Sequence, residues 1–150
     1  MKLDETLILE LAQKVSRGEL RISDLNGLDN EDKRAISKAS VTLRMITALS
    51  RKTMLEMLIK NETLKFNEAV AGFEQWKKRK IELMKKGRKV TLKEVHELNQ
   101  ALTKITGAEF KKNVYEKIFL PKAEKQLNAT TFAIIMDALA QPFIQLANSL

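Results

Sequence analysis

The sequence predicts an all-α fold, and three observations lead to this prediction. The 150 residues include only five glycines and two prolines, and most of these fall between segments of periodic hydrophobicity. No segment shows the sustained alternation of apolar and polar residues that indicates a β-strand. Leucine, lysine, alanine and glutamate dominate over β-branched residues. We therefore expect a single domain, residues 1–150, built as a bundle of about six or seven helices with short connections.

The first helix is expected at about Asp4–Arg17, with Gly18 just past its end as a left-handed cap. Apolar residues cover most of its circumference. We therefore expect it to be buried on more than one side, either inside the bundle or against another subunit. A short element around Ser23–Leu25 and a turn at Asn26–Gly27 should follow.

The second helix should begin at a cap formed by Asp29 or Asn30 and reach about Lys60. Its apolar stripe keeps one phase along this whole length, but hydroxyl residues such as Ser50 interrupt the stripe. The segment is therefore either one long helix or two helices that meet near Ser50–Lys52, and we favour a break or a kink there.

The third long helix should span about Glu62–Lys86, with Gly87 as its stop. Its first half carries one apolar arc, whereas cations occupy every side of the helix beyond Trp76. Because burying several unpaired lysines is costly, we expect the first half to pack on the core. The last two turns should then project from it.

A capping box predicts where the next helix begins, because Thr91 is followed three residues later by Glu94. This helix should end at Gly107. The loop before it is tight, so the two helices are expected to form an antiparallel hairpin. Arg88 and Lys89 would lie at the tip of that projecting basic hairpin.

The remaining chain predicts a helix at about Ala108–Leu120, a short helix beginning at Pro121, and a final helix from about Thr130. The final helix has apolar residues at the 4-3-4-3-4 spacing of a coiled-coil seam. Pro142 should kink the helix, although the seam keeps its phase. This seam is a candidate interface for self-association or a partner, and the favoured alternative is the centre of the bundle. Its residues are Phe132, Met136, Leu139, Phe143, Leu146 and Leu150.

Residues 77–89 hold almost all of the net charge. This segment, KKRKIELMKKGRK, has eight cations and one acid and is therefore +7, whereas the whole chain, with 27 basic and 19 acidic residues, is +8. A charge so concentrated indicates an element that binds a polyanion, either a nucleic acid or an anionic membrane surface, and the alternative is a solvated helix end. Eight cations exceed what a helix dipole alone calls for. The candidate phosphate contacts are Lys77, Lys78, Arg79, Lys80, Lys85, Lys86, Arg88 and Lys89.

Trp76 directly precedes this basic segment, and an indole in that place can stack on an unpaired base. It shares an apolar arc with Phe73, so packing in the core is the favoured alternative. A weaker group of seven cations against three acids lies within residues 31–60. This group would enlarge the polyanion-binding surface only if it faced the same side of the protein as residues 77–89. We favour the interpretation that it is ordinary surface.

The chain lacks the residues that catalysis and metal binding usually require. The chain has no cysteine, which excludes disulfides and thiolate metal sites. The single histidine, His96, has no second histidine at the metalloprotease spacing, and the glycines form no phosphate-cradling loop. A helix-turn-helix within residues 19–50 is disfavoured because its second helix would begin with Glu31 and Asp32. We expect no enzyme activity, no metal, no cofactor and no small-molecule substrate.

Two function hypotheses follow from these patterns. The leading one is a non-enzymatic nucleic-acid-binding accessory or packaging protein that contacts the phosphates of DNA or RNA with little sequence preference. The alternative is a helical protein-interaction module, namely an adaptor, inhibitor or oligomeric assembly subunit with an acidic protein partner.

The cellular setting is inferred from composition and from the start of the chain. The acidic residues near the start argue against an export signal, and no apolar run is long enough to span a membrane. We expect a cytoplasmic protein, or one within a virion or host cytoplasm. The lysine-rich, cysteine-free composition suggests a viral, plasmid or prokaryotic origin.

Overall fold

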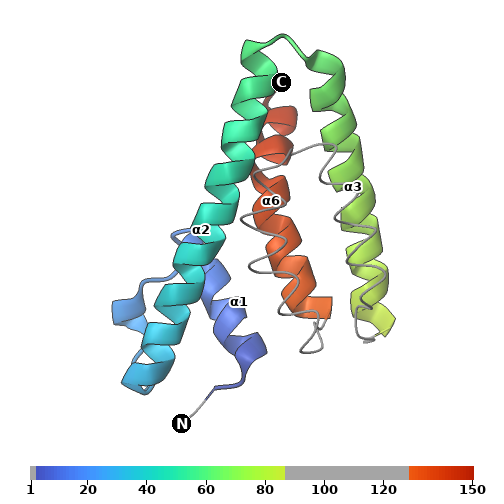
Figure 1. Cartoon of the computed structure of the whole chain (residues 1–150). Helices are drawn as coiled ribbons and strands as arrows, with labels where there is room; N and C mark the ends of the chain where they lie inside the picture. The colour runs from blue at the N-terminus through green and yellow to red at the C-terminus, as the bar shows by residue number, and fades with distance from the viewer. Residues whose placement is uncertain (1–2, 87–128) are drawn as a thin grey trace. The chain divides into compact units, whose positions relative to one another are not determined.

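A computed structural model describes residues 3–86 and 129–150 of the chain, and the described part is helical (Figure 1). No strand occurs within these two ranges, so the prediction of an all-α protein is confirmed. The elements are α1 (Glu5–Ser16), the 3-10 helix η1 (Ile22–Asp24), α2 (Asn30–Ile59), α3 (Thr63–Lys86) and α6 (Ala129–Ser149).

The helix count stays a prediction. The hairpin loop, the capping box at Thr91 and the helices expected between it and Pro121 all lie outside the described residues. None of the helices that the structure describes combines the length and apolarity that crossing a bilayer requires.

The chain divides into two compact units, Met1–Ile46 and Thr47–Leu150, and the boundary falls within α2. The expectation of a single domain over residues 1–150 stays a prediction. Unit 1 contains α1, η1 and the first part of α2. Unit 2 contains the rest of α2 together with α3 and α6.

Both ends of α1 are capped by local hydrogen bonds, and the cap at Gly18 is the one that the sequence predicts. The Asp4 carboxylate accepts the Leu7 N–H at 2.8 Å, which satisfies one of the free donors of the first turn. At the other end Gly18 has φ +76°, and the Glu19 N–H donates to the Lys14 carbonyl at 2.9 Å. This pattern is a Schellman motif, which needs a residue that tolerates a left-handed conformation. The predicted bounds of α1 are confirmed.

Burial of α1 is confined to one face. Leu9, Ala12 and Val15 are buried and lie along a single arc of the helix. Leu7, outside that arc, is 38% exposed. The expectation that α1 is buried on more than one side included burial against another subunit, so one buried face within unit 1 leaves it a prediction.

Two side chains of α2 join it to the rest of unit 1. Arg44 donates from Nη2 to the Val15 carbonyl at 3.2 Å, so a cation meets the carbonyl end of α1. The buried Asp32 carboxylate accepts the Leu3 N–H at 3.0 Å. Between α1 and α2, η1 and the turn at Asn26–Gly27 occupy their predicted places.

The C-terminus of α2 is closed by a second Schellman motif. Asn61 takes the left-handed conformation with φ +56°, and the Glu62 N–H donates to the Met57 carbonyl at 2.8 Å. Asparagine is one of the few residues besides glycine that adopts this conformation readily. The motif turns the chain from α2 into α3 in a few residues, at the upper end of Figure 1.

The predicted break in α2 near Ser50–Lys52 is wrong, because α2 is one helix from Asn30 to Ile59. The hydroxyl residues that interrupt the apolar stripe bond to a neighbouring helix. Ser50 is 1% exposed, and its hydroxyl donates to the Leu139 carbonyl of α6. A buried hydroxyl with a partner of this kind does not weaken the helix that carries it.

Pro142 explains why one carbonyl of α6, that of Ala138, is available to α2. Proline has no backbone N–H, so the Ala138 carbonyl, four residues earlier, lacks its helical donor. The Thr47 hydroxyl of α2 donates to that carbonyl at 3.0 Å. A hydroxyl from one helix thus replaces the bond that a proline removes from another, and the proline is accommodated inside α6.

Thr47→Val should therefore lower the free energy of unfolding by about 1–3 kcal/mol, because the Ala138 carbonyl would lose its donor. Pro142→Ala restores an N–H donor to that carbonyl, so Thr47→Val should cost less in the Pro142→Ala background. Urea unfolding of the double-mutant cycle measures this coupling. Thr42→Val is the control, because the Thr42 hydroxyl bonds only within its own helix, to the Lys38 carbonyl at 3.2 Å. Equal costs in both backgrounds would show that the two residues are not coupled.

The core of unit 2 is an aromatic cluster between α3 and α6. The ring of Phe143 lies 5.9 Å from that of Phe66 and 5.2 Å from that of Phe73, measured between centroids. All three side chains are buried. These distances fall in the range of favourable aromatic pairs. The first half of α3 therefore packs on α6, as the sequence predicts.

Candidate nucleic-acid interface

Burial falls along α3 as the helix approaches the basic segment. Phe66, Ala69 and Phe73 are buried at the spacing of one helix face. Trp76, next on this arc, is half-buried, and Ile81 is 50% exposed. Among the described side chains of α3, burial therefore decreases toward the basic segment. The projection of the last two turns from the core stays a prediction.

The first two cations of the segment, Lys77 and Lys78, are exposed. Within the described ranges neither side chain makes an ion pair. The exposed carboxylates of Glu74 and Glu82 lie one helical turn on either side of Lys78, yet they do not pair with it. These two lysines are therefore placed to attract an anion from solvent.

Unlike Lys77 and Lys78, Arg79 contacts an aromatic ring. Its guanidinium carbon lies 5.4 Å from the centroid of the Trp76 ring, which is the geometry of a cation–π contact. Such a contact contributes about 0.5–1 kcal/mol near a surface. Trp76 is thus neither fully in the core nor fully exposed.

The structure brings together only part of the predicted phosphate-binding set. It describes the side chains of Trp76, Lys77, Lys78 and Arg79 on one stretch of α3. The backbone of α3 includes Lys80, Lys85 and Lys86, whose side chains are not described, and Arg88 and Lys89 lie outside the described residues.

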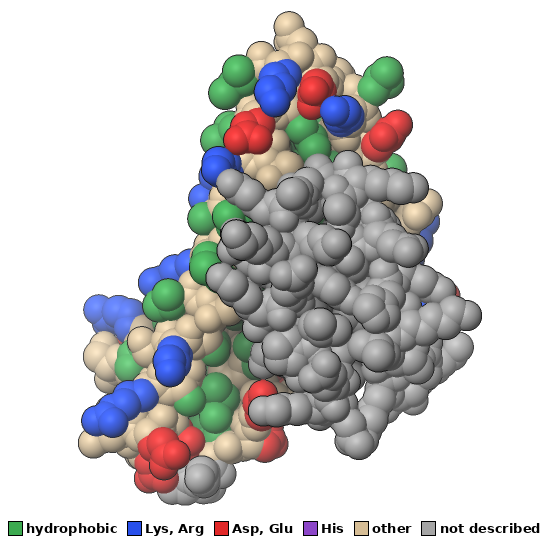
Figure 2. Space-filling model, in the orientation of Figure 1, with side chains coloured by type: hydrophobic (Ala, Val, Ile, Leu, Met, Phe, Trp, Pro, Cys, Tyr) green, Lys and Arg blue, Asp and Glu red, His purple; other side chains and the backbone are tan. Residues whose placement is uncertain are grey.

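One cation and one acid of the weaker basic group on α2 are engaged within unit 1. Arg44 is engaged by the Val15 carbonyl, and one of the three acids of the group, Asp32, is buried. Figure 2 shows several Lys and Arg side chains spread along unit 1 on the face drawn, with acidic side chains at its lower end.

Three residues of the predicted seam are buried in the core of unit 2. Met136, Leu139 and Phe143 are buried at 4%, 0% and 0% exposure, and the Phe143 ring packs on α3. This burial supports the centre of the bundle as the role of the seam. Leu146 is half-buried and Leu150 is exposed, while the side chain of Phe132 is not described.

No group of acidic or histidine side chains in residues 3–86 and 129–150 is arranged to hold a metal ion. Every buried side-chain nitrogen or oxygen there has a hydrogen-bond partner. His96 lies outside the described residues.

Comparison of the chain with models of protein families, with curated proteins and with solved structures finds no match in any of the three.

Sequence reasoning missed an apolar stripe on the outward face of α2 in unit 2. Leu55 is 47% exposed and Ile59 is 82% exposed, although both are large aliphatic residues. The signal was present in their spacing, since Ala48, Lys52, Leu55 and Ile59 follow one another by four, three and four residues. It was hidden because the inward face of the same helix is also apolar.

Proposed function

We propose that this chain is a non-enzymatic nucleic-acid-binding protein, an accessory or packaging component that contacts phosphates with little sequence preference. One observation carries the proposal: thirteen consecutive residues have a charge of +7 in a chain of +8. The exposure of Lys77 and Lys78, without an ion pair in the described residues, supports it.

The physical basis is the release of counterions. A phosphodiester backbone holds a layer of condensed cations, and each lysine or arginine that replaces one of them frees it into solution. A solvated helix end would need only one or two cations to complement its dipole, at about 0.3–1 kcal/mol each. The segment has eight, so the dipole does not account for it.

The finer geometry belongs to the same proposal. We expect the basic segment to continue beyond Lys86 into a projecting helical hairpin, with Arg88 and Lys89 at its tip. All eight cations of the segment would then reach phosphates, and Trp76 would lie beside them. Such a protein would act in the cytoplasm, in a virion or in a host cytoplasm.

The proposal predicts a steep dependence of binding on salt. If all eight cations contact phosphates, the logarithm of the binding constant should fall with the logarithm of salt concentration at a slope of about −7 on duplex and about −5.6 on single strands. Fluorescence anisotropy of labelled DNA and RNA oligonucleotides of about 30 nucleotides, from about 50 to 200 mM salt, measures these slopes.

An oligonucleotide with an uncharged methylphosphonate backbone is the control, and it should not bind. Absence of binding to every charged oligonucleotide, or binding that does not change with salt, would contradict the proposal. That result would favour the alternative, a helical module whose partner is an acidic protein.

A further inference from the structure

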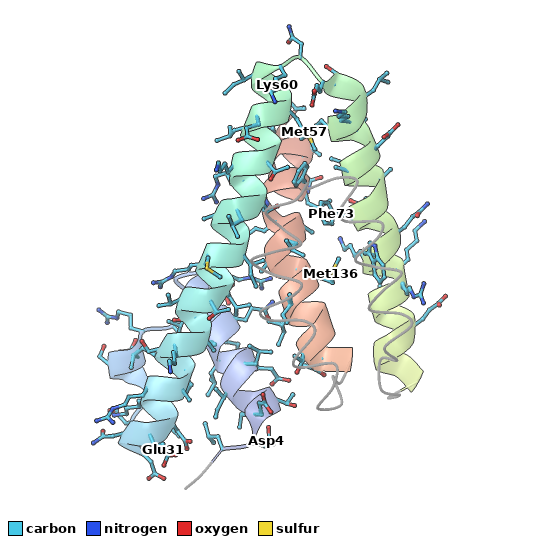
Figure 3. The ribbon with its side chains drawn as sticks, viewed as in Figure 1. Asp4, Glu31, Met57, Lys60, Phe73 and Met136 are labelled. Carbon is cyan, nitrogen blue, oxygen red and sulfur yellow. The ribbon has the colours of Figure 1, made fainter. Side chains whose placement is uncertain are left out.

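The turn between η1 and α2 contains an asparagine followed by a glycine. Of the eight asparagines in the sequence, only Asn26 has glycine as the next residue. Asn26 and Gly27 are both exposed and lie in the turn itself. Figure 3 labels Glu31 in the first turn of α2, and the Asn26–Gly27 turn precedes that end of the helix. The pair is therefore accessible to water and to hydroxide.

An asparagine in this setting can react with its own backbone. The backbone nitrogen of the next residue attacks the side-chain carbon Cγ, because the bond between these two atoms closes a five-membered ring. A side chain on the next residue hinders the approach, and glycine has none. Regular helices hold the backbone in one conformation, whereas exposed turns are more mobile. Asparagine is accordingly among the thermally labile residues.

The structure at Gly27 favours this reaction. Within the described residues the Gly27 N–H donates no hydrogen bond, so no acceptor holds its nitrogen away from the Asn26 side chain. Gly27 has φ +84°, and a Cβ built on it would meet no atom within 4 Å. The backbone nitrogen that must attack therefore lies in open space.

Asn61 offers a matched contrast within the same chain. It too is an exposed asparagine in a turn, and it follows Lys60, which is labelled at the upper end of α2 in Figure 3. The next residue is Glu62, whose N–H donates to the Met57 carbonyl at 2.8 Å. A side chain and a hydrogen-bonded nitrogen both oppose ring closure there. We therefore expect Asn61 to remain intact under conditions in which Asn26 reacts.

We propose that Asn26 is a site of spontaneous deamidation, which proceeds through a succinimide formed with Gly27. Base removes the proton of the Gly27 N–H, and the nitrogen bonds to Cγ of Asn26. The Cγ–Nδ2 bond then breaks, and ammonia leaves with the proton that the base returns. Water opens the ring at either carbonyl, which gives isoaspartate or aspartate. One water is consumed and one ammonia is released, and no oxidant or reductant takes part.

The modification changes both the backbone and the charge of the turn. Isoaspartate continues the main chain through its Cβ and Cγ, so it adds a methylene group to the connection between η1 and α2. The new carboxylate lowers the net charge of the chain by one, between the exposed residues Asp24 and Asp29. The basic segment keeps its sequence, so deamidation can be tested whether or not the proposed nucleic-acid binding is correct.

The test is peptide mapping by mass spectrometry after incubation of the full chain at neutral and at mildly alkaline pH. Asn26 should deamidate at least about tenfold faster than Asn61, which corresponds to a barrier lower by about 1.4 kcal/mol. The rate at Asn26 should rise with pH, because base removes the Gly27 proton. Equal rates at the two asparagines, or an unmodified Asn26, would overturn the proposal.

Mapping in urea tests the contribution of the fold. The described turn leaves the Gly27 nitrogen without an acceptor, so Asn26 in the folded chain should react within about tenfold of its rate in the unfolded chain. Circular dichroism confirms which state is incubated. A folded chain in which Asn26 reacts more slowly than this would show that the fold protects the turn, and that result would contradict the proposal.

Two variants separate this reaction from deamidation elsewhere. Asn26→Gln should remove the acidic product seen by ion-exchange chromatography, because glutamine has to close a larger ring. Asn67→Gln should leave that product unchanged, since Asn67 is exposed on α3 and is followed by Glu68. Neither position has a positive φ, so both variants should fold. An acidic product that survives Asn26→Gln would place the reaction at another residue and overturn the proposal.

Discussion

Changing Lys77, Lys78, Arg79 and Lys80 to glutamate should abolish nucleic-acid binding at moderate salt. The variant lacks four of the eight cations proposed to bind phosphate, and its four new carboxylates repel the backbone. Removing four cations should by itself make the salt slope on duplex shallower by about 3.6. Anisotropy titrations of the variant and the unmodified chain, over the same range of salt, measure both effects.

A variant with the same net charge is the control for this experiment. Changing Arg34, Lys38, Arg51 and Lys52 to glutamate alters the net charge equally, but on the exposed surface of α2. This control should keep most of the binding and most of the salt slope. Equal weakening in the two variants would mean that binding follows overall charge, in contradiction to a localised interface.

Both charge variants should fold, and circular dichroism checks this. Lys77 and Lys78 are exposed, so replacing them disturbs no packing. Replacing Arg79 removes its cation–π interaction with Trp76, which stabilises the fold by only about 0.5–1 kcal/mol near a surface. A change in nucleic-acid binding by a folded variant can then be assigned to the interface.

Phe143→Ala should lower the free energy of unfolding by about 3–5 kcal/mol, the range for removing a buried phenylalanine ring. The Phe143 side chain is fully buried between α3 and α6, with Phe66 and Phe73 packed against its ring. Its removal reduces apolar burial, leaves a cavity and breaks both aromatic pairs. Urea unfolding, followed by circular dichroism, measures the change.

Leu150→Ala is the matched control for Phe143→Ala. Leu150 belongs to the same 4-3-4-3-4 series of the predicted seam but is 90% exposed, so its truncation should change stability by less than about 0.5 kcal/mol. If Phe143→Ala does not fold, Phe143→Leu should still fold with a smaller decrease in stability. A decrease below about 1 kcal/mol for Phe143→Ala would contradict the packing described, since core truncations of this size cost several times more.

Much of the described fold was predictable because its signals are local. The caps of α1 follow from a carboxylate at Asp4 and a glycine at Gly18, which act within one turn of the chain. The start of α3 and the decrease in burial along its described side chains follow from residue order alone, whereas the predicted stop at Gly87 lies outside the described residues. The position of the cations along α3 was predictable for the same reason, because a charged run is a property of consecutive residues.

The continuity of α2 was not predictable from its own residues. Ser50 is a polar interruption in the sequence, and its role depends on the Leu139 carbonyl, 89 residues away. The role of the Thr47 hydroxyl likewise depends on the Ala138 carbonyl, which has no helical donor because residue 142 is proline. The sequence shows that a hydroxyl group is present, but only the tertiary structure shows which carbonyl accepts its hydrogen bond.

The division between the two apolar faces of α2 also needed the structure. Both faces have helical spacing, so periodicity alone cannot tell which one is buried. Helical class, cap positions and the concentration of charge were determined by the sequence, because each depends on residues close together in the chain. The burial of the predicted α6 seam, the accommodation of Pro142 and the outward stripe of α2 were decided by tertiary structure, because each depends on which distant residues pack together.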